Sequence, residues 1–273
     1  MNEREITSRD NALMKHARAV RDRKVRSQVF VEGLRLCEEV RHSLSVDDIM
    51  DVIYTERMAR DPRGASLLNS LRQEGGKLSC VSESVFASIS DTKTPQGIAI
   101  LASRPETDQS SFSEIPKKLP LLLILHRINN PSNAGALLRT AEAAGVTGVI
   151  LTAGSTDIFS PKALRGAMGA SFRLRLWTEA DFFEALNFCR ERGIRTVCAG
   201  LQAGRAHTDV DWTVPSALIV GSEATGLEPS ETAAADESLR IPMRPPVESL
   251  NVAVATGIVL YEAARQRAES SEQ

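Results

Sequence analysis

Residues 121–126, LLLILH, form an apolar run that ends directly before the polar segment 127–133, RINNPSN. A continuous apolar run of this length is typical of a strand buried on both faces. A helix is expected over 132–144, with Pro131 at its start and Gly145 at its end. Residues 148–152, GVILT, then form the next expected strand. The stretch 121–152 therefore predicts strand, crossover helix and strand, the unit from which parallel sheets are built.

The same alternation continues towards the C-terminus. Further buried strands are expected at 196–200 and 217–221, and helices at 181–192 and 250–267. This pattern predicts an α/β domain with a mostly parallel sheet and helices on both faces. Ligands of such sheets bind outside the carboxyl ends of the strands. The segments to inspect for a site are the loops after His126, Gly200, Gly221 and Ile241.

The first part of the chain predicts a smaller α/β domain. Strands are expected at 28–32, 49–55, 78–81 and 97–102, and helices at 11–20, 33–42 and 66–73. Residues 105–117 hold two prolines and several serines, which is typical of a linker. We therefore expect one domain over residues 1–104, a linker over 105–117 and a second domain over 118–273.

Composition excludes some classes of protein. The 273 residues carry a formal net charge of −2, which excludes a uniformly basic coat protein for nucleic acid. Aromatic residues make up 4%, which argues against binding of single strands on aromatic platforms. A local basic segment lies near the N-terminus, and it is either a solvated helix face or a candidate contact with an RNA backbone. Its residues are Lys15, Arg18, Arg21, Arg23, Lys24 and Arg26.

Several common sites and signals are missing from the sequence. The four cysteines lack zinc-ligand spacing, so we expect buried thiols in a reducing compartment and no metal. The N-terminal residues do not resemble a signal peptide, and no apolar run is long enough to cross a membrane. A cytoplasmic protein is therefore expected. The sequence also lacks GxGxxG and GxxxxGK[ST], which disfavours an ordinary dinucleotide fold or a P-loop enzyme.

Three polar clusters each follow an expected strand. They are 129–141, NNPSNAGALLRTA; 218–227, LIVGSEATGL; and 241–257, IPMRPPVESLNVAVATG. Each cluster alone is explained by helix capping or by a favourable charge near a helix N-terminus. Because the carboxyl ends of parallel strands share one edge of the sheet, the three together indicate a functional site.

The order of these three clusters closely resembles the three motifs of the SpoU/TrmH family, which are S-adenosylmethionine-dependent RNA ribose 2′-O-methyltransferases. The resemblance covers roughly residues 120–267. Residues 30–40, FVEGLRLCEEV, and 90–101, SDTKTPQGIAIL, are similar to the RNA-binding domain often attached to this family. The resemblance implies a deep trefoil knot at the carboxyl edge of the second sheet. It also implies a homodimer that forms through the widely apolar last helix.

The resemblance implies a role for particular residues. Asn133 and Arg139 match the catalytic pair of the first motif, Glu223 the acid of the second, and Ser249 and Asn251 the polar pair of the third. Arg139 either acts as an unusual base or positions a phosphate and polarises the 2′-hydroxyl, since a guanidinium is a poor base. The positions that match the cofactor-binding backbone are Ala199, Gly200, Leu201, Gly221, Ile241, Met243 and Leu250.

The activity expected from the resemblance is 2′-O-methylation of ribosomal RNA. One alternative is the same fold acting on transfer RNA, and another is a non-catalytic RNA-binding or ribosome assembly factor with a degenerate site. The retained motif residues argue against degeneracy. His126 and Arg127 are candidates for phosphate contacts, or His126 is a loop histidine satisfied within the protein. The sequence leaves the RNA and the modified nucleotide open.

Overall fold

The computed structural model describes residues 3–113, 115, 118–200, 203–223 and 225–271, which form two compact units. The first unit contains Met1–Pro105 and Ile158–Arg173, and the second contains Glu106–Asp157 and Leu174–Gln273. The sequence pattern assigned residues 158–173 to the second domain, whereas their contacts group them with the first unit. None of the helices in the described part of the chain is both long and apolar enough to cross a membrane.

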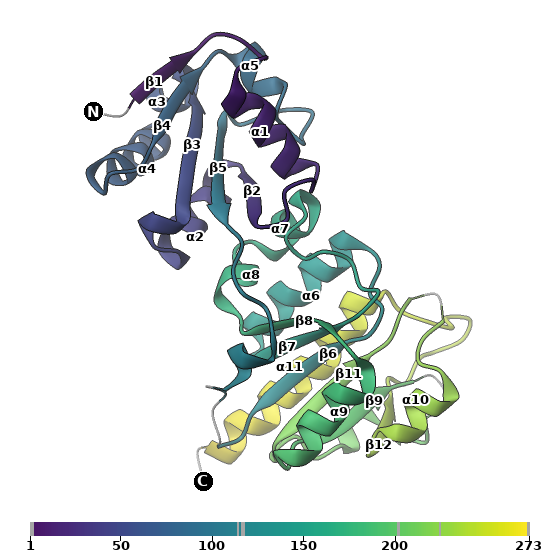
Figure 1. The fold of residues 1–273 in the computed structure, drawn as a ribbon. Helices are drawn as coiled ribbons and strands as arrows, with labels where there is room; N and C mark the ends of the chain where they lie inside the picture. Colours follow the sequence, from purple (N-terminus) through teal and green to yellow (C-terminus); the bar gives the residue numbers. More distant parts are fainter. Residues whose placement is uncertain (1–2, 114, 116–117, 201–202, 224, 272–273) are drawn as a thin grey trace. The chain divides into compact units, whose positions relative to one another are not determined.

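The first unit is built on a mixed five-stranded sheet of order β1-β4-β3-β5-β2 (Figure 1). Strand β4 pairs in parallel with β1 and β3, and β5 pairs antiparallel with β2 and β3. The strands are β1 (Glu3–Ile6), β2 (Gln28–Glu32), β3 (Ile49–Thr55), β4 (Leu78–Val81) and β5 (Ile98–Ser103). This confirms the expected small α/β domain. Strand β1 is an addition, because its sequence EREI lacks an apolar pattern.

Four helices of the first unit, α1, α3, α4 and α5, begin at side chains that cap backbone N–H groups. Asp61, for example, accepts hydrogen bonds from the backbone N–H groups of Arg63 and Gly64, so α4 begins four residues earlier than residue 66. The helices are α1 (Ala12–Arg21), α2 (Leu34–Ser43), α3 (Glu56–Arg60), α4 (Pro62–Gln73), α5 (Glu83–Ala87), α7 (Pro161–Ala167) and α8 (Ala170–Arg173). A short 3-10 helix, Val46–Asp48, precedes β3.

The second unit is built on a seven-stranded sheet of order β10-β12-β9-β11-β6-β7-β8, in which every neighbouring pair is parallel. The expected mostly parallel sheet is confirmed. The strands are β6 (Leu121–Leu125), β7 (Gly148–Thr152), β8 (Leu176–Ala180), β9 (Arg195–Ala199), β10 (Arg205–Ala206), β11 (Ser216–Val220) and β12 (Glu237–Arg240). The knot that the resemblance implies stays a prediction.

Helices cover both faces of this sheet (Figure 1). On one face α6 packs against α11, where Gly257 lies close to Thr140. The other face is covered by α9. The helices are α6 (Pro131–Ala143), α9 (Phe182–Glu191), α10 (Pro229–Ala234) and α11 (Val252–Ser271), with 3-10 helices at Gln109–Phe112 and His207–Asp209.

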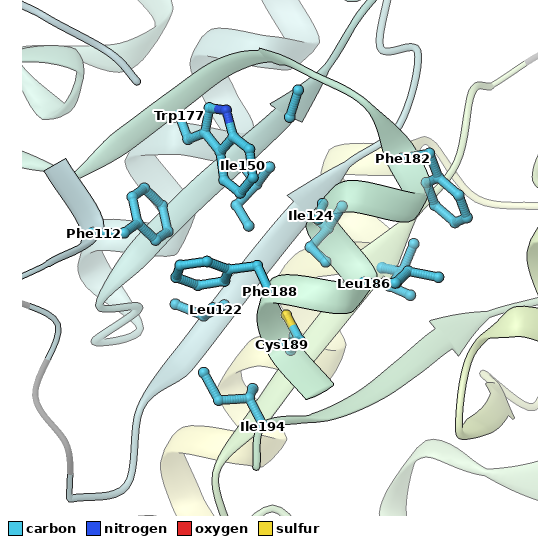
Figure 2. Close-up of a cluster of buried hydrophobic side chains, with 14 of the residues drawn as sticks. Phe112, Leu122, Ile124, Ile150, Trp177, Phe182, Leu186, Phe188, Cys189 and Ile194 are labelled. Carbon is cyan, nitrogen blue, oxygen red and sulfur yellow. The ribbon is translucent and has the colours of Figure 1, made fainter. Parts of the chain in front are cut away.

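The core beneath α9 is a cluster of buried apolar side chains that contains a group of aromatic rings (Figure 2). Phe112, Trp177 and Phe188 pack edge to face, with ring centroids 5.6–6.2 Å apart. Phe112 is 1% exposed, although it belongs to the segment expected as a linker. A Cβ atom at Gly148 would lie 2.9 Å from its ring, so this strand position requires glycine. Phe112, which precedes β6 in the chain, is therefore part of the second unit's core.

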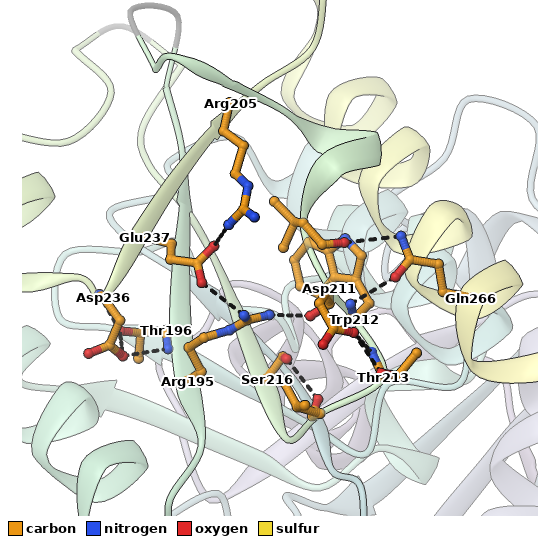
Figure 3. A network of polar contacts seen from close by, with 12 residues as sticks. Arg195, Thr196, Arg205, Asp211, Trp212, Thr213, Ser216, Asp236, Glu237 and Gln266 are labelled. Carbon is orange, nitrogen blue, oxygen red and sulfur yellow. Dashed lines mark hydrogen bonds and ion pairs between the residues drawn. The ribbon is translucent and has the colours of Figure 1, made fainter. Parts of the chain in front are cut away.

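Polar contacts fix the side of the sheet near β9 and β12 (Figure 3). The carboxylate of Glu237 forms ion pairs with two arginines. Its Oε1 lies 2.8 Å from Nη1 of Arg195, and its Oε2 lies 2.7 Å from Nη1 of Arg205. Asp236 accepts hydrogen bonds from the backbone and hydroxyl of Thr196. These contacts join the starts of β9, β10 and β12 to one another.

Candidate active site

The loops after β6, β9, β11 and β12 leave the same edge of the sheet, because these four strands are parallel and adjacent. Strand β6 ends at Leu125, β11 ends at Val220, and the backbone N–H of His126 donates to the carbonyl of Val220 at 2.8 Å. Two of the loops selected from the sequence, those after His126 and Gly221, therefore begin side by side. Leu201 lies outside the described residues.

A chain of side-chain contacts joins the three motifs. The amide of Asn133, in the first turn of α6, donates a hydrogen bond to the carboxylate of Glu223. The amide of Asn251 in turn donates to Oδ1 of Asn133 over 3.4 Å. Glu223 and Asn251 are exposed and Asn133 is half-buried, so a substrate can reach the group.

Helix capping, one explanation of the polar clusters, applies differently to the residues of the second and third clusters. Ser249 does not cap the last helix; Asn251 does, because its Oδ1 accepts hydrogen bonds from the backbone N–H groups of Ala253 and Val254. Asn251 therefore stands before the first turn of α11 and holds the helix N-terminus and Asn133 together. Glu223 does not begin a helix either, since α10 starts only at Pro229. Its carboxylate is held by Asn133 instead.

Arg139 lies on α6 with an exposed side chain. Among the residues that the structure describes, its guanidinium makes no hydrogen bond or ion pair, and the hydroxyl of Ser249 likewise makes no hydrogen bond. The structure therefore links Asn133, Glu223 and Asn251, but it does not bring Arg139 or Ser249 into that contact. An uncommitted guanidinium on an exposed helix face remains free to meet a phosphate.

The positions matched to cofactor binding lie on the same edge. Gly221 follows β11, and a Cβ atom there would lie 2.6 Å from the carbonyl carbon of Gly226, so only glycine permits this close loop. Ala199 ends β9, and at Gly200, which follows it, no described residue would lie within 4 Å of a Cβ atom. Ile241, Met243 and Leu250 lie on the segment between β12 and α11.

The basic segment in the first unit divides into two groups. Arg18 donates to the hydroxyl of Ser88 and the carbonyl of Arg9, and Arg21 donates to the carbonyls of Ser88 and Ser90. These two arginines hold the end of α1 to the loop after α5. The other four, Lys15, Arg23, Lys24 and Arg26, are exposed. Binding of RNA by the segment stays a prediction, and we expect it from the exposed group.

Sequence reasoning missed a group beside the first motif. His126 is 2% exposed and Glu231, on α10, is 4% exposed, and they face each other. His126 is thus a buried histidine and not a surface contact for phosphate. The signal in the sequence was weak, because its partner lies on a short helix that was not predicted. In the described part of the chain, no cluster of three or more His, Cys, Asp or Glu could hold a metal ion.

Comparison with known families matches both units. A family model described as the SpoU rRNA Methylase family matches residues 120–261, more than half of the chain. A second model, described as the MRM3-like substrate binding domain, matches residues 11–100. The two models match separate stretches of the chain, which lie within residues 118–273 and 1–104.

Individual relatives are similar over almost the whole chain. An uncharacterized tRNA/rRNA methyltransferase of Synechocystis sp. is 32% identical over 96% of this chain and 94% of its own. The 23S rRNA (guanosine(2553)-2'-O)-methyltransferase RlmP of Bacillus subtilis is 28% identical over 94% and 98%. The crystal structure of an AdoMet-bound rRNA methyltransferase from Sinorhizobium meliloti matches with a TM-score of 0.84, 28% identity and coverage of 97% and 98%. With its family match, its three joined motifs and its parallel sheet, this chain belongs to the SpoU rRNA methylase family.

Proposed function

We propose that this chain transfers the methyl group of S-adenosylmethionine to a ribose 2′-hydroxyl in ribosomal RNA. The observation that carries the proposal is the contact chain Glu223–Asn133–Asn251, which joins all three family motifs at one accessible edge. The 23S rRNA methyltransferase of B. subtilis and the AdoMet-bound enzyme of S. meliloti, both similar over nearly the full chain, support the substrate and the cofactor.

The segment between β12 and α11 fits the cofactor in its chemistry. Leu250 and Val247 are 37% and 51% exposed, which leaves apolar surface uncovered at the site. Among the described residues, the backbone N–H groups of Met243 and Leu250 have no hydrogen-bond partner. Unpaired backbone donors beside apolar side chains suit an adenine edge and a thioether chain. Bound S-adenosylmethionine supplies a methyl group activated by its positively charged sulfur.

The residues of the chain would act on the RNA. A ribose hydroxyl is a weak nucleophile, so it must be oriented and lose or share its proton. The Asn133–Glu223 hydrogen bond fixes one carboxylate oxygen of Glu223, which leaves the other oxygen free to accept a hydrogen bond from substrate. Arg139 supplies positive charge on the exposed face of α6, where it would hold a phosphate and polarise the hydroxyl.

The first unit would bind the RNA backbone through the exposed members of the basic segment, Lys15, Arg23, Lys24 and Arg26. This assignment rests on their exposure and on the match of residues 11–100 to a substrate-binding domain. The alternative substrate, transfer RNA, is supported by the joint tRNA/rRNA name of the Synechocystis relative.

We also infer that the chain forms a homodimer through α11. Val254, Ile258 and Tyr261 are 52%, 37% and 56% exposed and repeat at helical spacing, so they form an apolar stripe on one face. Light scattering of the purified chain tests this. The wild type should elute as a dimer, and Ile258→Glu should produce the monomer with an unchanged circular dichroism spectrum.

The decisive experiment is incubation with labelled S-adenosylmethionine and total RNA, followed by mapping of the label. Label on a ribose 2′-oxygen of ribosomal RNA supports the proposal. Label on a base rejects the mechanism, and label confined to transfer RNA favours the alternative substrate. Cofactor binding without any turnover would favour a non-catalytic RNA-binding factor.

A further inference from the structure

Four charged or titratable side chains form a compact group beside the candidate active site, and none belongs to the three-motif contact chain. We call His126, Arg127, Glu228 and Glu231 the clamp. Oε1 of Glu231 lies 3.0 Å from Nε2 of His126 and 3.2 Å from Nη2 of Arg127. Nη1 of Arg127 lies 3.0 Å from Oε1 of Glu228. Glu231 is thus shared between two cations or potential cations.

Contacts with β7 and α9 hold His126 of the clamp in place. Nδ1 of His126 lies 3.0 Å from the hydroxyl oxygen of Thr152 on β7, and its ring packs edge to face against Phe182 of α9. The same hydroxyl oxygen accepts a hydrogen bond from the backbone N–H of Arg127. Nε2 on the other side of the ring faces the carboxylate of Glu231. His126 and Arg127 therefore present fixed partners to α10.

Arg127 adopts a backbone conformation that is uncommon for residues other than glycine. Its φ is +53°, in the left-handed region. Such a conformation costs about 1 kcal/mol and persists where surrounding contacts hold it. Here the backbone N–H groups of Arg127 and Ile128 are held by Thr152 and Ser155, and the guanidinium by two carboxylates. The strained turn aims the Arg127 side chain at the start of α10.

The clamp faces the far end of the loop that carries Glu223. That loop leaves β11 at Val220, whose carbonyl accepts the backbone N–H of His126, and it ends at Glu228. The backbone N–H of Glu228 donates to Oε2 of Glu231 at 2.8 Å. Residues 126–127 therefore hold both ends of the loop, one through the backbone and one through side chains.

Between these ends the loop is closed on itself. The backbone N–H of Gly226 donates to the carbonyl of Ser222 at 2.8 Å, and Gly226 lies against Gly221. A closed loop with both ends held has little freedom to move Glu223 away from Asn133. We propose that Arg127, with His126 and Glu231, is a positioning residue that holds the Glu223 loop against Asn133 for methyl transfer.

This inference rests on the proposed function for its catalytic readout, but the clamp itself can be tested without catalysis. The measurement is hydrogen–deuterium exchange of the peptide that spans residues 217–228. Arg127→Gly removes the guanidinium and accepts the left-handed backbone, so the fold should survive. We expect exchange of this peptide to become at least tenfold faster in Arg127→Gly. Unchanged exchange would overturn the proposal, whether or not the wild type methylates RNA.

The kinetic test is a double-mutant cycle with Glu223→Gln. We expect Arg127→Gly to lower kcat about tenfold with little change in KM, because misplacing a reacting group by 1 Å costs up to about a hundredfold. In the Glu223→Gln background the same substitution should change kcat less than twofold, since Arg127 acts through Glu223. Equal losses in both backgrounds, or no loss in either, would refute a positioning role.

Two further variants separate positioning from general stability. Arg127→Lys keeps a cation within reach of the carboxylates and should recover most of kcat. Arg190→Ala removes another exposed arginine of the second unit, in the last turn of α9, whose guanidinium donates a hydrogen bond to Asn187. It should leave both kcat and exchange of the loop unchanged. A loss in Arg190→Ala equal to that in Arg127→Gly would count against the clamp.

Discussion

The side-chain amide of Asn133 donates a hydrogen bond to the carboxylate of Glu223, ninety residues later in the chain. Asn133 stands in the first turn of α6 after β6, and Glu223 in the loop after β11. The contact exists because β6 and β11 are parallel neighbours that end at the same edge. It fixes the orientation of a carboxylate that is otherwise exposed to solvent.

Replacing Asn133 by aspartate should make methyl transfer depend on pH in a new way. Asn133→Asp places two carboxylates in contact, and such a pair favours a state in which one of them holds a proton. At low pH the shared proton restores a hydrogen bond, whereas at high pH both groups are charged and repel. We expect the activity of Asn133→Asp relative to the wild type to fall as the pH rises from 6 to 8.

The matched control is Asn133→Ala, which removes the amide without adding a charge. Its relative activity should be low and should not vary over the same pH range. A ratio for Asn133→Asp that is flat with pH would show that its carboxylate does not meet that of Glu223.

Arg139 should be needed for methyl transfer and not for binding of the cofactor. Its guanidinium is exposed on α6 and makes no contact with the other motif residues in the described part of the chain. Loss of a positioned cation at a developing charge lowers kcat by about a hundredfold or more. Arg139→Ala should therefore lose nearly all turnover, while calorimetry should find the affinity for S-adenosylmethionine almost unchanged. Lost cofactor affinity would assign Arg139 to the cofactor pocket instead.

Features of the fold that depend on neighbouring residues could be predicted from the sequence, and features that depend on contacts between distant residues could not. Apolar runs such as 121–125 lie within a few residues, so four strands of the parallel sheet and the site edge could be predicted, whereas β8, β10 and β12 were not. Strand β1 could not, because its EREI sequence lies at a sheet edge and buries only Ile6. The contact of His126 with Glu231 joins residues 105 positions apart and carries no periodic pattern. The placement of residues 158–173 in the first unit is likewise a tertiary property.

Affinity for RNA should depend on the exposed basic side chains and decrease with salt. Each phosphate contact contributes about 0.7–0.9 to the slope of log affinity against log salt concentration. The triple variant Lys15→Ala, Lys24→Ala, Arg26→Ala should therefore have a slope lower by about 2. Fluorescence titration of a ribosomal RNA fragment at several salt concentrations measures it.

A second triple variant controls for net charge. Arg57→Ala, Arg60→Ala and Arg63→Ala remove three other exposed arginines of the first unit, which pair with nearby glutamates. The slope should stay at the wild-type value. If both triple variants lower it equally, the basic segment is no specific interface and only the total charge counts.

Arg267 should be a main source of stability in the second unit. Its guanidinium donates to the backbone carbonyls of Leu119, Pro120, Trp212 and Val214 at 2.8–3.1 Å, which ties the end of α11 to two segments far away in sequence. Burial lowers its pKa to about 10, so it keeps its charge at neutral pH. A hydrogen bond from a charged group stabilises by about 1.5–3 kcal/mol, and water replaces part of the loss at this half-buried site.

We therefore expect Arg267→Ala to lower the free energy of unfolding by about 3 kcal/mol, measured by urea denaturation. Arg265 lies on the same helix and makes exposed ion pairs with Glu262 and Glu269. Arg265→Ala should change the urea midpoint little, because exposed pairs contribute little. Similar midpoints for the two variants would mean that the four carbonyl contacts of Arg267 add nothing to stability.

The buried ring of His126 should make stability depend on pH below neutrality. Burial lowers its pKa below the ordinary 6.5; Arg127 acts in the same direction, while Glu231 and Glu228 oppose it. The other groups packed on the ring, Thr152 of β7 and Phe182 of α9, carry no charge.

The unfolded chain therefore binds a proton at His126 at a higher pH than the folded chain does. The contribution of the neutral ring to the free energy of unfolding is complete above about pH 6.5, and it is lost as the pH falls towards the folded-state pKa. Urea midpoints of the wild type should decrease between pH 7.5 and 5.5 by more than those of His126→Gln, in which no proton binds. The comparison removes the contribution of the three other histidines, which both proteins share. An equal decrease in the two proteins would mean that the pKa of His126 is the same in the folded and the unfolded chain. Burial of the ring would then have no effect on how stability depends on pH.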